Sequence, residues 1–331
     1  MSDGLEVSND LFIPATEEER EGIQRMREPI SFCQDAWRRF KKNKLALISA
    51  GFIVLIILFA FIGPFFSPYR MDQQIKGSEY IKPFQNWSHP LGTDSLGRDE
   101  FVRLMGGARI SLAIGVVASF MVVIIGVIYG AIAGYFGGWV DTVMMRFVDI
   151  IYSVPSMLVI ILLQVVLTPT LNDLFRQNQS LAFLSNLGSA LISIFITFAL
   201  LYWVDMARMV RGQILSLKQS EYVNAAKALG AKSGRIMFKH LVPNSLGIII
   251  VTAMLNIPTA IFTEAFLSFI GLGVSAPQAS LGSMANSALE GIYSYSYLLI
   301  LPSVIISFII LSFNLVGDGL RDALDPKMKS K

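Results

Sequence analysis

Cysteine and histidine are scarce in this 331-residue sequence, and their scarcity excludes several kinds of site. The single cysteine, Cys33, cannot form an internal disulfide or a cysteine metal cluster. His89 and His240 are the only histidines and lie far apart in the sequence, so we expect no metal site. Charged residues make up 15% of the chain, against about 25% in ordinary soluble domains. The net charge of +3 gives no electrostatic basis for binding nucleic acid.

Motifs for nucleotide binding and hydrolysis are also missing. Lys232 precedes Ser233, but the Gly-x4-Gly-Lys-Ser/Thr loop that binds phosphates does not surround them. The sequence contains neither a Gly-x-Ser-x-Gly nor a His-Glu-x-x-His motif. We therefore predict that the chain is not an enzyme, has no catalytic residues and binds no cofactor itself.

Long hydrophobic runs dominate the rest of the sequence. Hydrophobic residues make up 53% of the chain, and the mean hydropathy is +0.58. Runs of about 18 to 24 residues are long enough to cross roughly 30 Å of hydrocarbon as helices. The predicted fold is an all-α integral membrane protein, a bundle of six transmembrane helices in a lipid bilayer. The expected spans are 45–66, 110–133, 147–167, 187–204, 248–270 and 297–316.

Lysine and arginine are distributed unevenly between the two sides of this bundle. Roughly 20 of the 27 lie in the two termini and in the loops after the second and fourth spans, which places these parts in the cytoplasm. The predicted cytoplasmic parts are the tail 1–44, the loop 205–244 and the tail 318–331, with the span domain at 45–317. The predicted outward loops are 67–109, 168–186 and 271–296.

The segment 37–44, just before the first span, mixes aromatic and cationic residues. Trp37 and Phe40 suit the membrane interface, with the five cations of the segment near anionic headgroups. The alternative is a signal that only fixes the orientation of the first span. Both interpretations agree with an interfacial helix at the end of the amino-terminal tail.

Three glycines of the second span, Gly126, Gly130 and Gly134, recur every four residues on one helix face. Lipid gives helices no hydrophobic reason to associate, so small residues that allow close backbone contact favour packing. This pattern predicts a tightly packed helix within the bundle rather than a ligand site.

Two acidic residues are candidates for a translocation path. Asp149 lies at the predicted start of the third span, shortly before Pro155, and is either an interfacial or a gating residue. Glu264 and Ser268 lie in the fifth span, just before a Gly-Leu-Gly break. A charge inside hydrocarbon is costly unless it faces water or a partner. Glu264 therefore either lines a conduit or satisfies backbone groups where the helix ends.

The polar stretch between the fourth and fifth spans is too long for a plain turn. A short helix is expected there, because Ser220 can cap its first turn and Glu221 suits the positive end of its dipole. Gly230 can adopt the left-handed conformation that ends it. The small side chains of Ala225 and Ala226 allow close approach of another protein. The alternative is a solvated connector without a partner.

The same stretch resembles the EAA loop of importer-type ABC permeases, Glu-Ala-Ala-x3-Gly-x9-Ile-x-Leu-Pro. Gly230 and Pro243 occupy the expected offsets, whereas Asn224 replaces glutamate, His240 replaces isoleucine and Val242 replaces leucine. The resemblance implies that this stretch couples to an ATPase. The residues implied in coupling are Ser220, Glu221, Tyr222, Asn224, Ala225, Ala226, Gly230 and Pro243.

Further blocks resemble the C-type membrane subunit of the oligopeptide, dipeptide and nickel branch of ABC importers. The most specific one reads His-Pro-Leu-Gly-Thr-Asp-Ser-Leu-Gly-Arg-Asp at 89–99, and a second follows at 103–112. Others lie at 37–44, 267–273 and 314–326, so the resemblance covers nearly the whole chain.

The resemblance implies a set of partners. A homologous permease subunit would form a heterodimer with this chain around a central path. Two ATP-binding subunits, carrying ATP and Mg, would dock on the cytoplasmic side, and an extracytoplasmic substrate-binding protein would deliver a peptide. The setting would be a bacterial-type plasma (inner) membrane. Nickel chelates, glutathione-like compounds and other small solutes are alternative substrates, and an ion-coupled secondary transporter is the rival class.

In the first block, Asp94, Arg98 and Asp99 are expected to brace one another or a neighbouring subunit. Gly92 and Gly97 are turn residues that suit a fixed, hydrogen-bonded loop. Docking of the substrate-binding protein is the alternative role for this loop.

Overall fold

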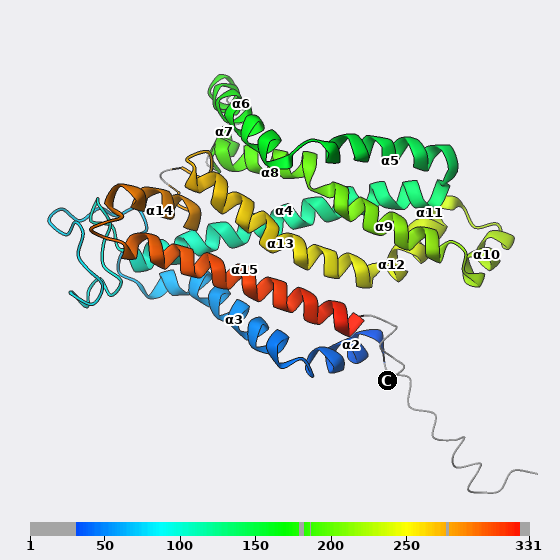
Figure 1. Ribbon diagram of the computed structural model, residues 1–331, viewed down its shortest axis with the longest axis horizontal. Coiled ribbons are helices and arrows are strands. Elements are labelled where there is room, and N and C mark those ends of the chain that lie inside the picture. Colours follow the sequence, from blue (N-terminus) through cyan, green and yellow to red (C-terminus); the bar gives the residue numbers. More distant parts are fainter. Residues whose placement is uncertain (1–30, 179–181, 186, 276–277, 325–331) are drawn as a thin grey trace, which may run out of the picture.

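The computed structural model describes residues 31–178, 182–185, 187–275 and 278–324, most of which lie in helices (Figure 1). Within these ranges there is no β-strand, and six helical stretches are long and apolar enough to cross a membrane. The predicted all-α bundle with six spans is therefore confirmed. The spans are α3 (Lys44–Phe61), α4 (Glu100–Phe136), α6 (Ser156–Gln177), α8 with α9 (Ser189–Leu201 and Trp203–Leu217), α13 (Leu246–Phe269) and α15 (Tyr297–Leu324).

Shorter helices precede, connect or flank these spans. They are α2 (Phe32–Phe40), η2 (Gly63–Phe66), α5 (Gly138–Ser153), α7 (Ala182–Ser185), α10 (Glu221–Ala228), α11 (Ser233–Arg235), the π-helical η4 (Ile236–Leu241), α12 (Val242–Asn244), α14 (Leu281–Ser287) and η5 (Ala288–Gly291). The outer parts of the two predicted tails, 1–30 and 325–331, lie outside the described residues.

Figure 1 shows an elongated molecule in which most of the long helices lie along one axis. Helix α10 projects at one end, and the loop 67–99 lies near α14 at the other end. Helix α4 has 37 residues and is about 55 Å long, well beyond the roughly 30 Å of hydrocarbon. The two segments that the sequence singled out therefore lie at opposite ends of the bundle.

The glycine face of α4 packs directly on α9, as the sequence predicts. A Cβ atom added at Gly126 would lie 2.6 Å from the side chain of Met206, and one at Gly134 would lie 2.9 Å from the carbonyl oxygen of Arg211. At Gly130 an added Cβ would collide with the backbone of Ala207. Only glycine allows this approach of the two helices.

The third span begins later than predicted. The range 147–167 is wrong, because α6 begins at Ser156 and the preceding α5 ends at Ser153. Pro155 lacks a backbone N–H and restricts the residue before it, so the two helices are separate. Helix α5 buries only Val148 and is not one of the spans.

Other boundaries differ as well. Helix α3 ends at Phe61, before η2, instead of at 66. Elsewhere charged helix ends extend beyond the apolar runs, and α6 continues to Gln177, which shortens the predicted outward loop 168–186. Helix α4 begins at Glu100, α9 continues to Leu217 and α15 continues to Leu324. These helix ends change three predicted ranges: the outer loop 67–109, the cytoplasmic loop 205–244 and the span domain 45–317. The long outer loop is therefore 67–99, and the polar segment between α9 and α13 is 218–245.

Buried side chains connect the polar segment to the spans. Val223 of α10 and Ile236 and Leu241 of η4 share one core cluster with Met206 and Ile214 of α9. All five are fully or almost fully buried. Because α9 packs on α4, continuous side-chain packing connects α10 to two spans.

Candidate functional site

Helix α10 begins at Ser220, although the predicted side-chain cap is not formed. Ser220 has the extended backbone typical of an N-cap, but its hydroxyl donates to the carbonyl oxygen of Leu217 at 2.6 Å. Glu221 occupies the first turn, where a carboxylate favours the positive end of the helix dipole. The start of the helix is therefore as predicted, but its physical cause differs.

The end of α10 is a glycine-terminated turn. Gly230 has φ +77°, the left-handed conformation expected from the sequence. The N–H of Ala231 donates to the carbonyl of Ala226, and that of Gly230 donates to the carbonyl of Lys227. This pair of bonds is the Schellman motif, which satisfies the last carbonyls of a helix.

Most of α10 is exposed. Val223 is its one buried side chain, whereas Tyr222, Asn224 and Ala225 are exposed. Leu229, just after the helix, is 88% exposed. A short helix held by one buried residue and flanked by an exposed leucine can dock into the groove of another protein.

Pro243 lies where the polar segment turns into α13. It is the second residue of α12, and the six residues before α12 form the π-helix η4. Proline supplies no N–H to the preceding turn, and π-helical turns are rare and occur mostly as single turns within helices. Asn244, the next residue, bonds the carbonyl oxygen of His240 and the hydroxyl of Tyr222. Pro243 and Tyr222 therefore lie close to the same junction.

A ladder of ion pairs joins α5 to α9. Arg208 of α9 lies 2.9 Å from Asp149, and Arg211 contacts both carboxylate oxygens of Asp141 at 2.5 Å. The guanidinium of Arg208 also lies 4.3 Å from the centre of the Tyr152 ring. Asp149 is thus in α5 rather than in the third span, and sequence reasoning missed its partner.

Glu264 is fully buried where α13 meets α4 and α14. Its two carboxylate oxygens accept hydrogen bonds from Ser111 at 2.9 Å and from Ser268 at 2.7 Å. The hydroxyl of Ser268 in turn accepts the N–H of Val274 at 3.0 Å, just beyond the end of α13. The carboxylate therefore belongs to a hydrogen-bonded network that stabilises the end of this helix.

Asp94 organises the outer loop. One of its carboxylate oxygens accepts the backbone N–H groups of Leu96 and Arg98, both at 2.9 Å. The other lies 2.7 Å from Nε of Arg98 and 3.5 Å from Nε of Arg103. Gly97 has φ +70°, and an added Cβ would collide with the backbone of Ile75. The loop is therefore braced internally.

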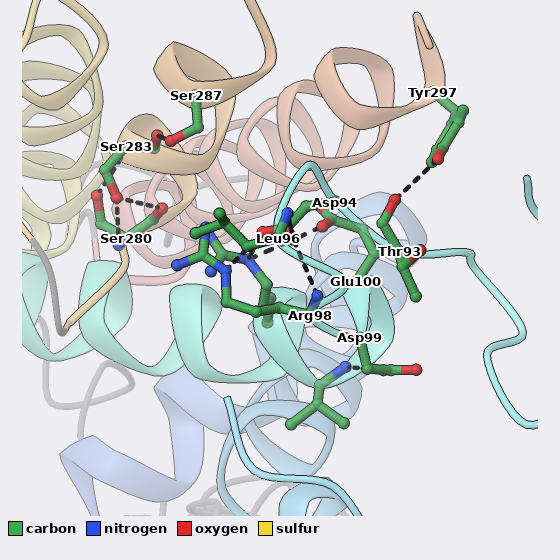
Figure 2. A network of polar contacts seen from close by, with 12 residues as sticks. Thr93, Asp94, Leu96, Arg98, Asp99, Glu100, Ser280, Ser283, Ser287 and Tyr297 are labelled. Carbon is green, nitrogen blue, oxygen red and sulfur yellow. Dashed lines mark hydrogen bonds and ion pairs between the residues drawn. The ribbon is translucent and has the colours of Figure 1, made fainter. Parts of the chain in front are cut away.

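Asp99 connects this loop to α4 and to a buried histidine. Its Oδ1 caps α4 by accepting the N–H of Val102 at 2.9 Å, and its Oδ2 lies 2.7 Å from Nδ1 of His89. Figure 2 shows the loop at the start of α4, with Tyr297 of α15 reaching Thr93. His89 and Arg103 were not predicted as site residues, although both lie in the sequence blocks quoted above.

Two family models match this chain. The model described as "Binding-protein-dependent transport system inner membrane component" matches residues 126–330, which includes α10 and Glu264. The chain belongs to this family. A second model, the N-terminal TM domain of oligopeptide transport permease C, matches residues 31–83. The family and the six apolar helices indicate a multi-pass inner membrane protein that is a transport permease rather than an enzyme.

Several curated relatives are similar over almost their full length. The dipeptide transport system permease protein DppC of Bacillus subtilis is 45% identical, with 98% of this chain and 95% of the relative covered. The oligopeptide transport system permease protein OppC of the same organism is also 45% identical, with 98% and 99% covered. The glutathione transport system permease protein GsiD of Pectobacterium atrosepticum is 35% identical, with 90% and 92% covered.

Proposed function

We propose that this permease is one of two membrane subunits of an ATP-driven peptide importer, and that α10 is the surface bound by an ATP-hydrolysing partner. The projecting helix α10 is the observation that carries the proposal. It is fixed to the bundle by Val223 while Leu229 remains exposed. Leu229 lies beside Gly230 and presents an exposed apolar side chain that can pack into a groove of a partner protein. ATP and Mg belong to that partner.

The proposed orientation places α10 and both termini in the cytoplasm. The excess of lysine and arginine in the tails and in the segment 218–245 supports it. The loop 67–99, at the opposite end of the bundle, then faces outward and is available to a substrate-binding protein. Its internal bonds suit a fixed docking platform.

The peptide substrate is proposed from the relatives. Two of those quoted are named for dipeptide and oligopeptide transport, and another is named for glutathione transport. A homologous permease subunit would complete a central path in a heterodimer. Nickel chelates and other small solutes are the second candidates, since the sequence resemblance extends to that branch.

The mechanism requires that the partner binds α10 differently in two states of the bundle. A ligand shifts a conformational equilibrium only through its differential affinity for the two states. The core cluster around Val223 transmits displacement of α10 to α9, and the contact of α9 with α4 extends it to the glycine face. ATP-driven closure would thus alternate the bundle between inward-open and outward-open forms.

Among the predicted path residues, we propose different roles for Asp149 and Glu264. The Asp149 side chain is 53% exposed and its ion pair with Arg208 lies at the surface of this chain, where the second permease or a substrate can reach it. Glu264 and Ser268 are buried and fully engaged within the chain. Asp149 is therefore the candidate for the path, and Glu264 with Ser268 supports the outer end of α13.

Reconstitution tests the proposed function. The chain would be placed in proteoliposomes with the second permease, two ATP-binding subunits and the substrate-binding protein, and uptake of a labelled dipeptide would be measured. We expect uptake only with ATP and all partners present. Uphill uptake by this chain alone under an ion gradient would overturn the proposal.

Cysteine labelling tests the orientation separately. In a Cys33→Ser background, Ala228→Cys on α10 and Ser88→Cys on the outer loop are both exposed positions. A membrane-impermeant maleimide should label the Ser88→Cys variant from outside intact cells and the Ala228→Cys variant only after lysis. The reverse pattern would exclude coupling through α10.

A further inference from the structure

The boundary of the first span carries exposed cations that have no acidic partner within the part of the chain that the structure describes. Arg38, Lys41, Lys42 and Lys44 are exposed, and within the described residues none of them forms a salt bridge. Arg39 is different, since it pairs with Asp35 at 3.0 Å. Such a concentration of uncompensated positive charge repels itself unless anions are nearby.

These cations lie at the end of α2 and at the start of α3, and α2 is held in place because one of its sides is packed. Phe40 is 4% exposed and lies in a cluster with Ala46 and Val316, so its ring packs against side chains of this chain rather than facing outward. An added Cβ at Gly319 would lie 3.2 Å from the Phe40 ring, which shows how closely α2 approaches α15. The buried ring fixes α2 against the end of the last span.

Beside the buried Phe40, α2 also carries an exposed aromatic side chain. Trp37 is 54% exposed, and its ring stacks on Phe40 with centroids 5.8 Å apart. Nζ of Lys41 lies 5.1 Å from the centre of the Trp37 ring. A tryptophan beside lysines is the composition that membrane interfaces favour.

The height of this surface relative to the bilayer follows from α3. Leu45 is 65% exposed and Ile48 is 69% exposed, directly after the cations. These apolar side chains belong to a span and therefore face hydrocarbon. Lys44 is adjacent to Leu45, and Lys41 and Lys42 lie within about one helical turn of it. A bilayer around α3 would therefore place its phosphate groups near these cations.

We propose that α2 and the start of α3 form a binding surface for the phosphate headgroups of anionic phospholipids. The ammonium groups of Lys41 and Lys42 contact the phosphates, Trp37 lies at the carbonyl level and Phe40 joins the site to α15. Bound lipid then holds α2 against the end of α15. This inference rests on membrane insertion and is independent of the transported substrate.

Native mass spectrometry of the full-length chain from nanodiscs tests the proposal. The nanodiscs would contain equal amounts of phosphatidylglycerol and phosphatidylcholine, and the ratio of retained lipids would be measured. We expect the wild type to retain phosphatidylglycerol preferentially. In the Lys41→Gln/Lys42→Gln variant, the ratio of retained phosphatidylglycerol to phosphatidylcholine should fall roughly fivefold for each cation removed. The Lys41→Arg/Lys42→Arg variant keeps the charge and should retain it.

The control removes two exposed lysines from the outer loop, in the Lys76→Gln/Lys82→Gln variant. It should retain phosphatidylglycerol as the wild type does. Equal preference in wild type and Lys41→Gln/Lys42→Gln, or an equal loss in the control, would overturn the proposal. If the first variant fails to insert, the lipid preference of the wild type is compared at about 0.05 and 0.5 M salt. The higher salt should abolish the preference, because it screens exposed charges, and an unchanged preference would overturn the proposal.

Discussion

The hydroxyl of Tyr297, at the start of α15, lies 2.9 Å from the carbonyl oxygen of Thr93, which is 204 residues earlier in the chain. The same hydroxyl lies 2.9 Å from the carbonyl oxygen of Ile81. It therefore fastens two points of the outer loop to the last span. Tyr80 of this loop also stacks on Tyr295, with ring centroids 4.0 Å apart.

Replacing Tyr297 by phenylalanine should loosen this loop. Tyr297→Phe removes the donor and leaves two carbonyl oxygens without it, at a cost of about 1 kcal/mol. We expect a lower melting temperature in detergent and faster proteolysis within 67–99. Tyr293→Phe is the matched control, because Tyr293 is fully exposed. Equal melting of Tyr297→Phe and wild type would show that the bond contributes nothing.

Charge reversal at Arg98 tests the brace around Asp94. Arg98→Glu places a second carboxylate beside Asp94 and removes a contact of 2.7 Å. Because the pair is largely buried, we expect less assembled complex after purification. Lys82→Glu, an exposed reversal in the same loop, should assemble normally. Normal assembly of Arg98→Glu with weaker binding of the substrate-binding protein would instead indicate a docking role.

Much of the fold could be predicted from the length of the apolar runs and from the residues of local turns. The polar pairs between residues far apart in the sequence could not be predicted. Six apolar runs predict six spans, and Gly230 predicts the end of α10. The arginine partners of Asp149 and Asp141 lie 59 and 70 residues away, and Ser111 lies 153 residues from Glu264. Nothing in a single sequence pairs residues at such separations. Charged helix ends were missed for a related reason, since a membrane pattern detects only apolar residues.

The turn after α10 should be essential for coupling but not for insertion. Gly230→Val forces a β-branched residue into φ +77°, at a cost of about 1–2 kcal/mol, and adds bulk at the proposed docking surface. ATP-dependent uptake should fall to background while the amount of inserted chain is unchanged. Ala226→Leu should act similarly. Gly212→Val, at an exposed helical glycine with open space around it, is the control. Normal ATP-dependent uptake by Gly230→Val would show that the turn after α10 is not needed for coupling.

The ladder between α5 and α9 should stabilise the chain through matched charges. Arg211 contacts both oxygens of Asp141, a geometry that combines charge with two hydrogen bonds. Asp141→Asn should lower the melting temperature, and the exchange Asp141→Arg/Arg211→Asp should recover part of the loss. Asp173→Asn, at an exposed position with no ion pair within the described chain, should change nothing. Failure of the exchanged pair to recover any stability would show that charge pairing is not the source.

Substitutions at Glu264 separate the two roles that its sequence position allows. Glu264→Leu leaves the hydroxyls of Ser111 and Ser268 buried without their acceptor, so a loss of roughly 2–3 kcal/mol or more is expected. Glu264→Gln keeps a carbonyl oxygen for one serine, and the other hydroxyl can rotate to accept from the amide. If Glu264 only supports the end of α13, Glu264→Gln should restore both the melting temperature and uptake. A variant that melts like wild type but transports at less than a tenth of its rate would place the carboxylate on the translocation path.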